Sequence, residues 1–150
     1  MARLPVLPVI AAKTKFQPVY VRDLARAIAS AALDPAGHGG KAYEIAGPQV
    51  MSMLELHRAI LDITGQKPDL VPAPDAFGSL LSRFGWLPGA PLTRDQWLML
   101  QRDNVASSDL PGLEVFGIEP TPLTAVAGEW LGRYGKPRFT ARRIHLNATS

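Results

Sequence analysis

The chain has no cysteine among its 150 residues, and it has no long uninterrupted apolar run. The first absence excludes disulfides and thiolate metal sites, and it is consistent with a reducing compartment. The second leaves no segment close to the ~20 apolar residues that a membrane-spanning helix requires. Residues 1–12 are apolar, but Pro5 and Pro8 interrupt them. We therefore interpret this segment as a strand or extended stretch that followed a longer chain, not as a signal peptide.

Groups of residues with catalytic or metal-binding spacing are also lacking. The three histidines, His38, His57 and His145, are scattered, and no pair has the spacing of metal ligands. Ser107 and Ser108 lack the Gly-x-Ser-x-Gly context of a nucleophilic serine. We therefore expect no catalytic residue and no metal site in this chain.

Acidic residues are missing from the last part of the chain. All thirteen acids lie before residue 133, and residues 133–150 carry five cations, so the rest of the chain has eleven cations and a net charge of −2. A basic segment of this kind can bind nucleic acid or anionic lipid through phosphate charge. We favour the simpler interpretation that residues 135–150 are a solvated, disordered tail, and we expect no nucleic-acid partner.

What is present is ordinary globular composition, with 47% hydrophobic and 19% charged residues. Fourteen prolines and thirteen glycines divide the chain into short elements. A chain of this length can bury roughly two-thirds of its extended surface, which is sufficient for one domain.

Residues 16–65 follow a strand, helix, strand, helix pattern. Residues 19–21, Val-Tyr-Val, suit a strand, and Asp23 is a candidate N-cap for the helix that follows. Residues 41–46 form a second strand candidate. Ser52 and Glu55 then form a capping box, and Gly65 fits the position just after that helix.

Three further helices and one short strand are predicted in the remainder. Leu70-Val71-Pro72 is the strand candidate, and the helices start at Asp75, at Thr93 with its capping partner Gln96, and at Thr121-Pro122. The helix after Thr93 is almost continuously apolar, which predicts burial on more than one side.

The segment at residues 84–88, Phe-Gly-Trp-Leu-Pro, is apolar and conformationally broken. We favour packing against the main domain, and a pocket wall or a hydrophobic docking patch is the alternative.

Taken in order, these segments resemble the extended and atypical short-chain dehydrogenase/reductases, the NAD-dependent epimerase/dehydratase superfamily. The closer resemblance is to one branch, the NAD(P)H-binding accessory subunit of respiratory complex I and its bacterial relatives. The residues that carry it lie between about residues 4 and 134, and they are Phe16 to Ala25, Tyr43 to Pro48, Ser52 to Leu56, Pro88 to Gln96, Arg102 to Val105 and Phe116 to Leu123.

The resemblance implies an α/β fold: an incomplete Rossmann-like domain, with its C-terminal strands and a small, mostly helical substrate lobe, over residues 1–134. The chain departs from the superfamily in two ways. It has no Gly-rich turn between a strand and a helix, which the pyrophosphate of a dinucleotide requires. It also has no Tyr followed four residues later by Lys, the usual catalytic pair: at that spacing Tyr20, Tyr43 and Tyr134 are followed by Leu24, Gly47 and Arg138.

The function implied is that of a C-terminal fragment of a complex I accessory-like protein, with a nucleotide-binding or structural role and no catalysis by this chain alone. NAD(P)H would belong to the full-length relative, and we expect none to bind this chain tightly. The alternative is the substrate lobe of an active NAD(P)-dependent epimerase, dehydratase or reductase; a third hypothesis is an autonomous interaction module that uses the basic tail. The partner would be a missing N-terminal half or another subunit, such as respiratory complex I, and the implied location is cytoplasmic, including a peripheral position on the inner face of a bacterial inner membrane.

If a pocket is present, we expect Gln17, Tyr20, Arg102 and Asn104 to supply its polar lining. Gln17 and Tyr20 flank the strand end that faces the ligand in relatives, and Arg102 and Asn104 follow a helix of the substrate-type lobe. The simpler interpretation of Arg102 is a cation at a helix C-terminus. Without a first half to cover it, the chain is also expected to expose apolar surface and to be marginally stable or prone to aggregation.

Overall fold

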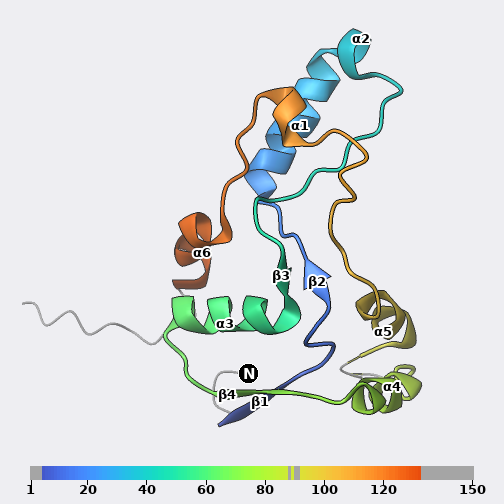
Figure 1. Cartoon of the computed structure of the whole chain (residues 1–150), viewed down its shortest axis with the longest axis vertical. Helices are drawn as coiled ribbons and strands as arrows, with labels where there is room; N and C mark the ends of the chain where they lie inside the picture. Colours follow the sequence, from blue (N-terminus) through green and yellow to red (C-terminus); the bar gives the residue numbers. More distant parts are fainter. Residues whose placement is uncertain (1–4, 88, 90–91, 133–150) are drawn as a thin grey trace, which may run out of the picture.

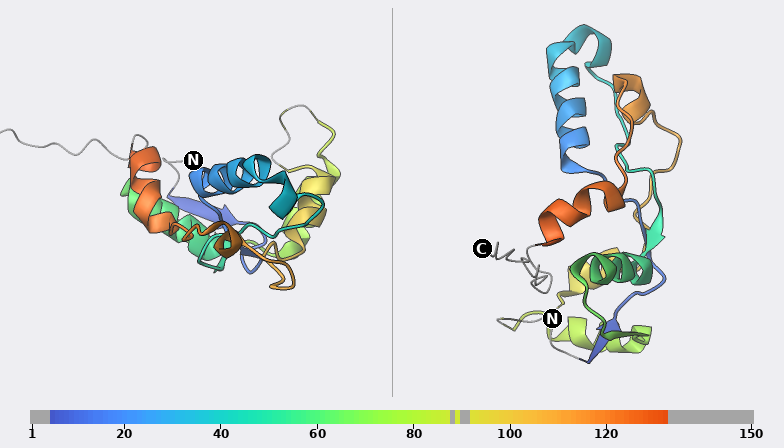
Figure 2. Two further views of the ribbon diagram at one scale, coloured as in Figure 1. Left: turned by 90° about the horizontal axis from the view of Figure 1, so that it is seen from above. Right: turned by 90° about the vertical axis from the view of Figure 1, so that its left-hand side faces the viewer.

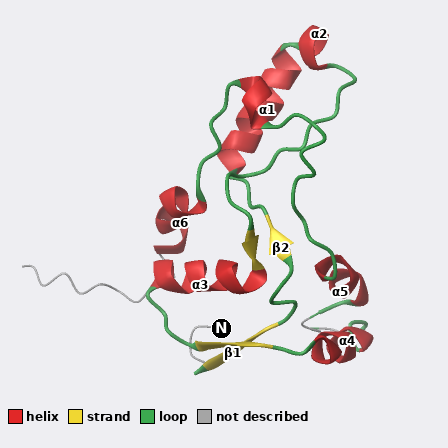
Figure 3. Ribbon diagram, viewed as in Figure 1, coloured by secondary structure: helices red, strands yellow, loops and turns green. Residues whose placement is uncertain are grey.

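The computed structural model describes residues 5–87, 89 and 92–132, and they form an elongated α/β arrangement (Figure 1). The strands are short and the helices are more prominent, as the colouring of Figure 3 shows. The strands are β1 (Val6–Val9), β2 (Lys15–Phe16), β3 (Met51–Ser52) and β4 (Asp69–Pro72). The helices are α1 (Val21–Leu33), α2 (Pro35–His38), α3 (Met53–Thr64), α4 (Asp75–Arg83), α5 (Arg94–Leu100), the 3₁₀ helix η1 (Leu113–Phe116) and α6 (Leu123–Leu131).

The strands make two separate two-stranded sheets. β1 pairs with β4 in parallel, so that Val6 lies opposite Asp69, and β2 pairs with β3 in antiparallel orientation. A parallel pair requires a long crossover connection, and here the chain passes through α1 and α3 before it returns. The mixed α/β class is therefore confirmed. The larger Rossmann-like sheet stays a prediction about a longer relative.

The helices lie at two ends of the molecule, with α6 between them. Helices α1 and α2 and the η1 turn form one end, and α3, α4, α5 and the β1–β4 pair form the other (Figure 1). The right-hand view of Figure 2 shows the same separation, and α6 contacts α3. Each end has a small core of its own: Ala27, Leu113 and Ile118 at one, and Ala11, Leu92 and Trp97 at the other.

The helix boundaries follow the capping chemistry of the sequence at three places. The capping boxes of Ser52 with Glu55 and of Thr93 with Gln96 are both formed, with bonds in each direction. Gly65 ends α3 with φ of 66°, a left-handed conformation that a residue without Cβ adopts without strain. These three predictions are confirmed. The sequence could predict them because each capping partner lies within one turn of the helix end.

Three other cap predictions are wrong. Helix α1 begins at Val21, two residues before Asp23, and its N-cap is Tyr20. Helix α4 has Pro74 as its N-cap, with no bond from Asp75, and α6 begins at Leu123, after Pro122 instead of after Thr121. In the first case the carboxylate has a more distant partner, which is described below.

The two central strand predictions are also wrong. Val19 and Tyr20 lead into α1, Val21 is its first residue, and residues 41–46 are irregular. The Glu44 amide donates to the Pro111 carbonyl at 3.0 Å, but no ladder continues from it. A strand requires a run of main-chain hydrogen bonds with a neighbour, and among the described residues neither segment forms such a run. The prediction at residues 70–72 is confirmed, because β1 lies beside them.

Several apolar residues that were expected to be buried are exposed. On α5 only Trp97 is buried, whereas Leu98 and Met99 are 55% and 74% exposed, so burial on more than one side is wrong. Phe84, Trp86 and Leu87 are exposed as well, so the favoured packing of this segment is not seen within the described chain. The apolar exposure itself is confirmed, and the aggregation that we expect from it stays a prediction. The predicted tail at 135–150 lies outside the described residues.

Candidate functional site

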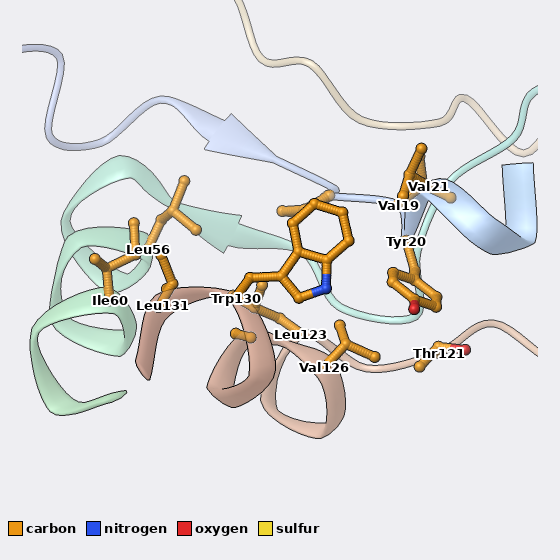
Figure 4. Close-up of a pocket in the computed structure, with 12 residues that line it drawn as sticks. Val19, Tyr20, Val21, Leu56, Ile60, Thr121, Leu123, Val126, Trp130 and Leu131 are labelled. Carbon is orange, nitrogen blue, oxygen red and sulfur yellow. The ribbon is translucent and has the colours of Figure 1, made fainter. Parts of the chain in front are cut away.

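An apolar groove of about 310 Å³ lies between α3, α6 and the segment that enters α1 (Figure 4). Leu56 and Ile60 line it from α3, and Trp130 extends across it from α6. The remaining lining residues come from the α1 entry and from α6 with the turn before it: Pro18, Val19, Tyr20, Val21, Thr121, Leu123, Val126, Ala127 and Leu131.

A buried carboxylate fixes the geometry of this groove. Asp23 of α1 is only 3% exposed, and its Oδ2 accepts a hydrogen bond of 2.8 Å from the amide of Thr121. This bond ties the start of α1 to the turn that leads into α6, across 98 positions of sequence. A buried polar side chain requires a hydrogen-bond partner of this kind, so Asp23 serves as a tie between two walls of the groove.

The lining of the groove is almost entirely apolar. Only Tyr20, Thr121 and Trp130 bring polar side-chain atoms to its lining, and none of the lining residues has an acid, amine or imidazole group. Tyrosine and threonine hydroxyls can take part in acid–base or nucleophilic catalysis, but apart from those of Tyr20 and Thr121 the lining is almost entirely apolar. The groove is therefore suited to apolar side chains or an apolar ligand.

Gln17 links three segments of the chain. Its Nε2 donates to the Gly47 carbonyl at 2.8 Å, and its Oε1 accepts from the Ala106 amide at 3.0 Å. Both the nitrogen and the oxygen of the side-chain amide thus bond to main chain, so Gln17 holds the segments of residues 47 and 106 beside its own.

Asn104 lies beside Gln17, and the other two predicted site residues lie elsewhere. The Asn104 amide donates to the Lys15 carbonyl at 2.8 Å, and Asn104 and Gln17 together line a small cavity of about 170 Å³. Tyr20 lines the apolar groove, and Arg102 is exposed beyond α5, outside the linings of both cavities. The structure thus brings two of the four residues together. Whether any of the four contacts a ligand stays a prediction.

Glu44 and Glu114 were not identified from the sequence, and they line a further cavity of about 310 Å³ that also includes Gln17. The Ser107 hydroxyl and amide both donate to Glu44 at 2.7 Å, and these bonds hold the pKa of Glu44 below its usual value. The Gly112 amide has the same effect on the pKa of Glu114. Among the described residues no three His, Cys, Asp or Glu side chains gather as a metal site would require, and no sequence spacing signals this cavity.

The Glu44 contact predicts a dependence of stability on pH. Because the pKa of Glu44 is lowered on folding, its contribution is present above the ordinary value of 4.5 and is lost as the pH falls through the folded value. Urea denaturation of the chain should give a midpoint that declines below pH 4.5, and Glu44→Gln should reduce that decline. Asp109→Asn, at an exposed acid of the same region, is the control and should leave the pH profile unchanged; an equal change in both variants would contradict the assignment.

Comparison with known proteins identifies relatives over most of the chain. It is 34% identical over 134 residues, 88% of its length, to NADH dehydrogenase [ubiquinone] 1 alpha subcomplex subunit 9, mitochondrial, of Rattus norvegicus, and equally to the protein of that name from Mus musculus. It is 44% identical over 61 residues, 41% of its length, to the Arabidopsis thaliana protein of the same name. The chain spans about a third of the rodent proteins, 35% of each. No family model matches it.

In the described part of the chain, every helix is too short or too polar to cross a bilayer.

Proposed function

Because this chain is a homologue of the NADH dehydrogenase alpha subcomplex subunit 9 family, we propose that it is the C-terminal part of an NAD(P)H-binding accessory-subunit-like protein of the atypical short-chain dehydrogenase/reductase type. Its role in that protein is structural: it docks on the nucleotide-binding part and performs no catalysis alone. That protein is an accessory subunit of a respiratory NADH dehydrogenase, and it lies at the inner face of the membrane in which the complex is embedded.

The observation that carries this proposal is a second apolar face on α1. One face packs through Ala27 against Leu113 and Ile118. The other carries Val21 and Ile28, which are 51% and 60% exposed, and it includes the exposed alanines at 25, 29 and 32. These positions follow the i, i+4, i+7, i+8 and i+11 spacing of one helix face. Val21 also lines the apolar groove, so the two surfaces are continuous.

A helix that is apolar on two sides is normally buried on both. The described chain covers only one of them. The relatives supply a candidate for the other, because about two-thirds of their length has no counterpart here. Small alanine side chains on this face permit close approach of a neighbouring element, as expected for a surface that packs inside a larger domain.

A chimera tests the proposal. The region of mouse subunit 9 that matches this chain would be replaced by this chain, and the chimera would be expressed in mouse cells that lack subunit 9. We expect it to appear in the assembled NADH dehydrogenase on native gels. Val21→Glu with Ile28→Glu should prevent this, and Leu33→Glu should not, since Leu33 is 86% exposed and lies off that face. A folded chimera that never enters the complex would show that the proposal is wrong.

NAD(P)H binding separates this role from an autonomous nucleotide-binding domain. Calorimetric titration of NADH and NADPH into this chain alone should show no low-micromolar binding, because the described residues contain no Gly-rich turn at a helix N-terminus to hold the pyrophosphate. Low-micromolar affinity would contradict the proposal.

The substrate lobe of an active NAD(P)-dependent epimerase, dehydratase or reductase is the second candidate. Sequencing the DNA upstream of the codon for Met1 distinguishes the two. A Gly-rich motif with a Tyr-x-x-x-Lys pair would favour the enzyme, and a Gly-rich motif alone would favour the accessory protein.

A further inference from the structure

Helix α4 has its large apolar side chains on the outside. Its small residues Gly78 and Ser82 are buried, and a Cβ at Gly78 would overlap the indole of Trp97 on α5. Phe77, Leu80 and Phe84, at i, i+3 and i+7 spacing, are 42%, 55% and 53% exposed. Amphipathic helices of globular domains show the reverse arrangement, so this face is suited to an apolar environment outside the described chain.

Beside this helix lies an open pocket of about 770 Å³ that combines cationic and apolar side chains. Arg83 and Arg94 line it together with Trp86, Trp97 and Leu98, while Ser79 and Ser82 add hydroxyl groups. Its lining contains no carboxylate, and neither arginine has a hydrogen bond or ion pair with any residue that the structure describes. Two guanidinium groups without an acid attract an anion, and an oxyanion such as a phosphate or a carboxylate matches their geometry; we take phosphate as the ligand because of the apolar side chains beside them.

The apolar side chains around the arginines indicate which kind of molecule carries the phosphate group. Trp86 is 80% exposed and Leu98 is 55% exposed, and both line the same pocket. Residues 77–99 hold seven of the seventeen large apolar side chains that are exposed in the described chain, so this hairpin is the most apolar part of its surface. Tryptophan and arginine beside exposed Phe and Leu are typical of elements that lie in the interface of a bilayer.

We propose that the α4–α5 hairpin docks on the surface of a membrane that contains anionic phospholipid. Arg83 and Arg94 bind lipid phosphates, and Trp86 enters the interface beside them with the outer face of α4. The hairpin lies on the membrane and does not span it. This surface is separate from the α1 face and the apolar groove, so the inference does not depend on the accessory-subunit role.

Vesicle binding tests this inference on the full chain. We expect sedimentation with vesicles of phosphatidylcholine and phosphatidylglycerol, and much weaker sedimentation with phosphatidylcholine alone. Arg83→Gln with Arg94→Gln should weaken partition about tenfold to thirtyfold, since each cation near an anionic surface contributes on the order of 1 kcal/mol. Arg22→Gln with Arg26→Gln, which removes two exposed cations of α1, is the matched control and should have a smaller effect. Equal losses in the two double variants, or equal binding to both vesicle types, would overturn the proposal.

The face that meets the lipid is identified by fluorescence. Brominated lipids should quench tryptophan emission of the chain; Trp86→Phe should remove most of this quenching, and Trp130→Phe should not. If the quenching depends on Trp130 instead, the apolar groove is the bound face and the proposal is wrong. Saturable binding of inorganic phosphate through Arg83 and Arg94, without vesicle binding, would also overturn it in favour of a small phosphate-bearing ligand.

Discussion

Replacing Gly47 with alanine is expected to destabilise the chain by about 3 kcal/mol, near the upper end for the insertion of one methyl group into a closely packed site. A Cβ at this position would overlap the carbonyl oxygen of Pro18, which is backbone and cannot turn aside as a side chain can. The Gly47 carbonyl also accepts the Nε2 bond of Gln17, and that bond holds the two segments at this separation. The chain must therefore either break the Gln17 contact or shift the entry to α1.

The measurement is urea denaturation followed by far-UV circular dichroism, with size-exclusion chromatography to detect a variant that does not fold. Gly128→Ala is the matched control: Gly128 is an exposed residue within α6, and no atom lies within 4 Å of an added Cβ. Alanine has the higher helix propensity, so this variant should gain up to about 1 kcal/mol. A similar midpoint for the two variants would show that the close approach of Gly47 to Pro18 is not required.

How much of the fold the sequence predicts depends on how far apart the interacting residues lie. The capping boxes at Ser52 and Thr93 and the left-handed Gly65 were predicted because each is complete within a few residues. Residues 41–46 have the composition of a strand and still form none, since a strand depends on pairing with a neighbouring segment and its own composition does not provide that partner. The spacing of Phe77, Leu80 and Phe84 places them on one side of α4, but periodicity does not say whether that side points inward, and the structure leaves it exposed.

The candidate site shows the same limit. Gln17 and Asn104 were expected to line one pocket, and they do line one small cavity. They meet because the segment before α1, which carries Gln17, lies beside the segment after α5, which carries Asn104. Tyr20 lines a different cavity, and the groove that it lines was not foreseen, because it forms between helices α3 and α6, which are far apart in sequence. The Glu44 contact with Ser107 likewise joins residues 63 positions apart, and no local pattern signals it.

Asp23 is the residue whose role changed most between the sequence and the structure. Its place in the segment Val21-Arg22-Asp23-Leu24-Ala25 suggested an N-cap, and capping predicts a loss confined to the first turn of α1. The structure instead gives its carboxylate a partner across the groove, the Thr121 amide. No side-chain hydrogen bond caps the start of α1, so the bond to the Thr121 amide is the role that the structure gives this carboxylate, and it ties α1 to the turn before α6.

Replacement of Asp23 with alanine is therefore expected to cost about 1–3 kcal/mol, because it leaves the Thr121 amide without its acceptor. Asp23→Asn is the matched variant: it retains a side-chain oxygen for that bond, and we expect a loss below about 1 kcal/mol. Urea denaturation gives the two losses, and amide hydrogen exchange locates them. In Asp23→Ala the Thr121 amide should exchange faster, whereas amides in the middle of α3 should not change beyond the global loss of stability. If exchange instead rises only in the first turn of α1 and Thr121 stays protected, Asp23 acts as a cap after all, and the walls of the groove are held together by the apolar contacts alone.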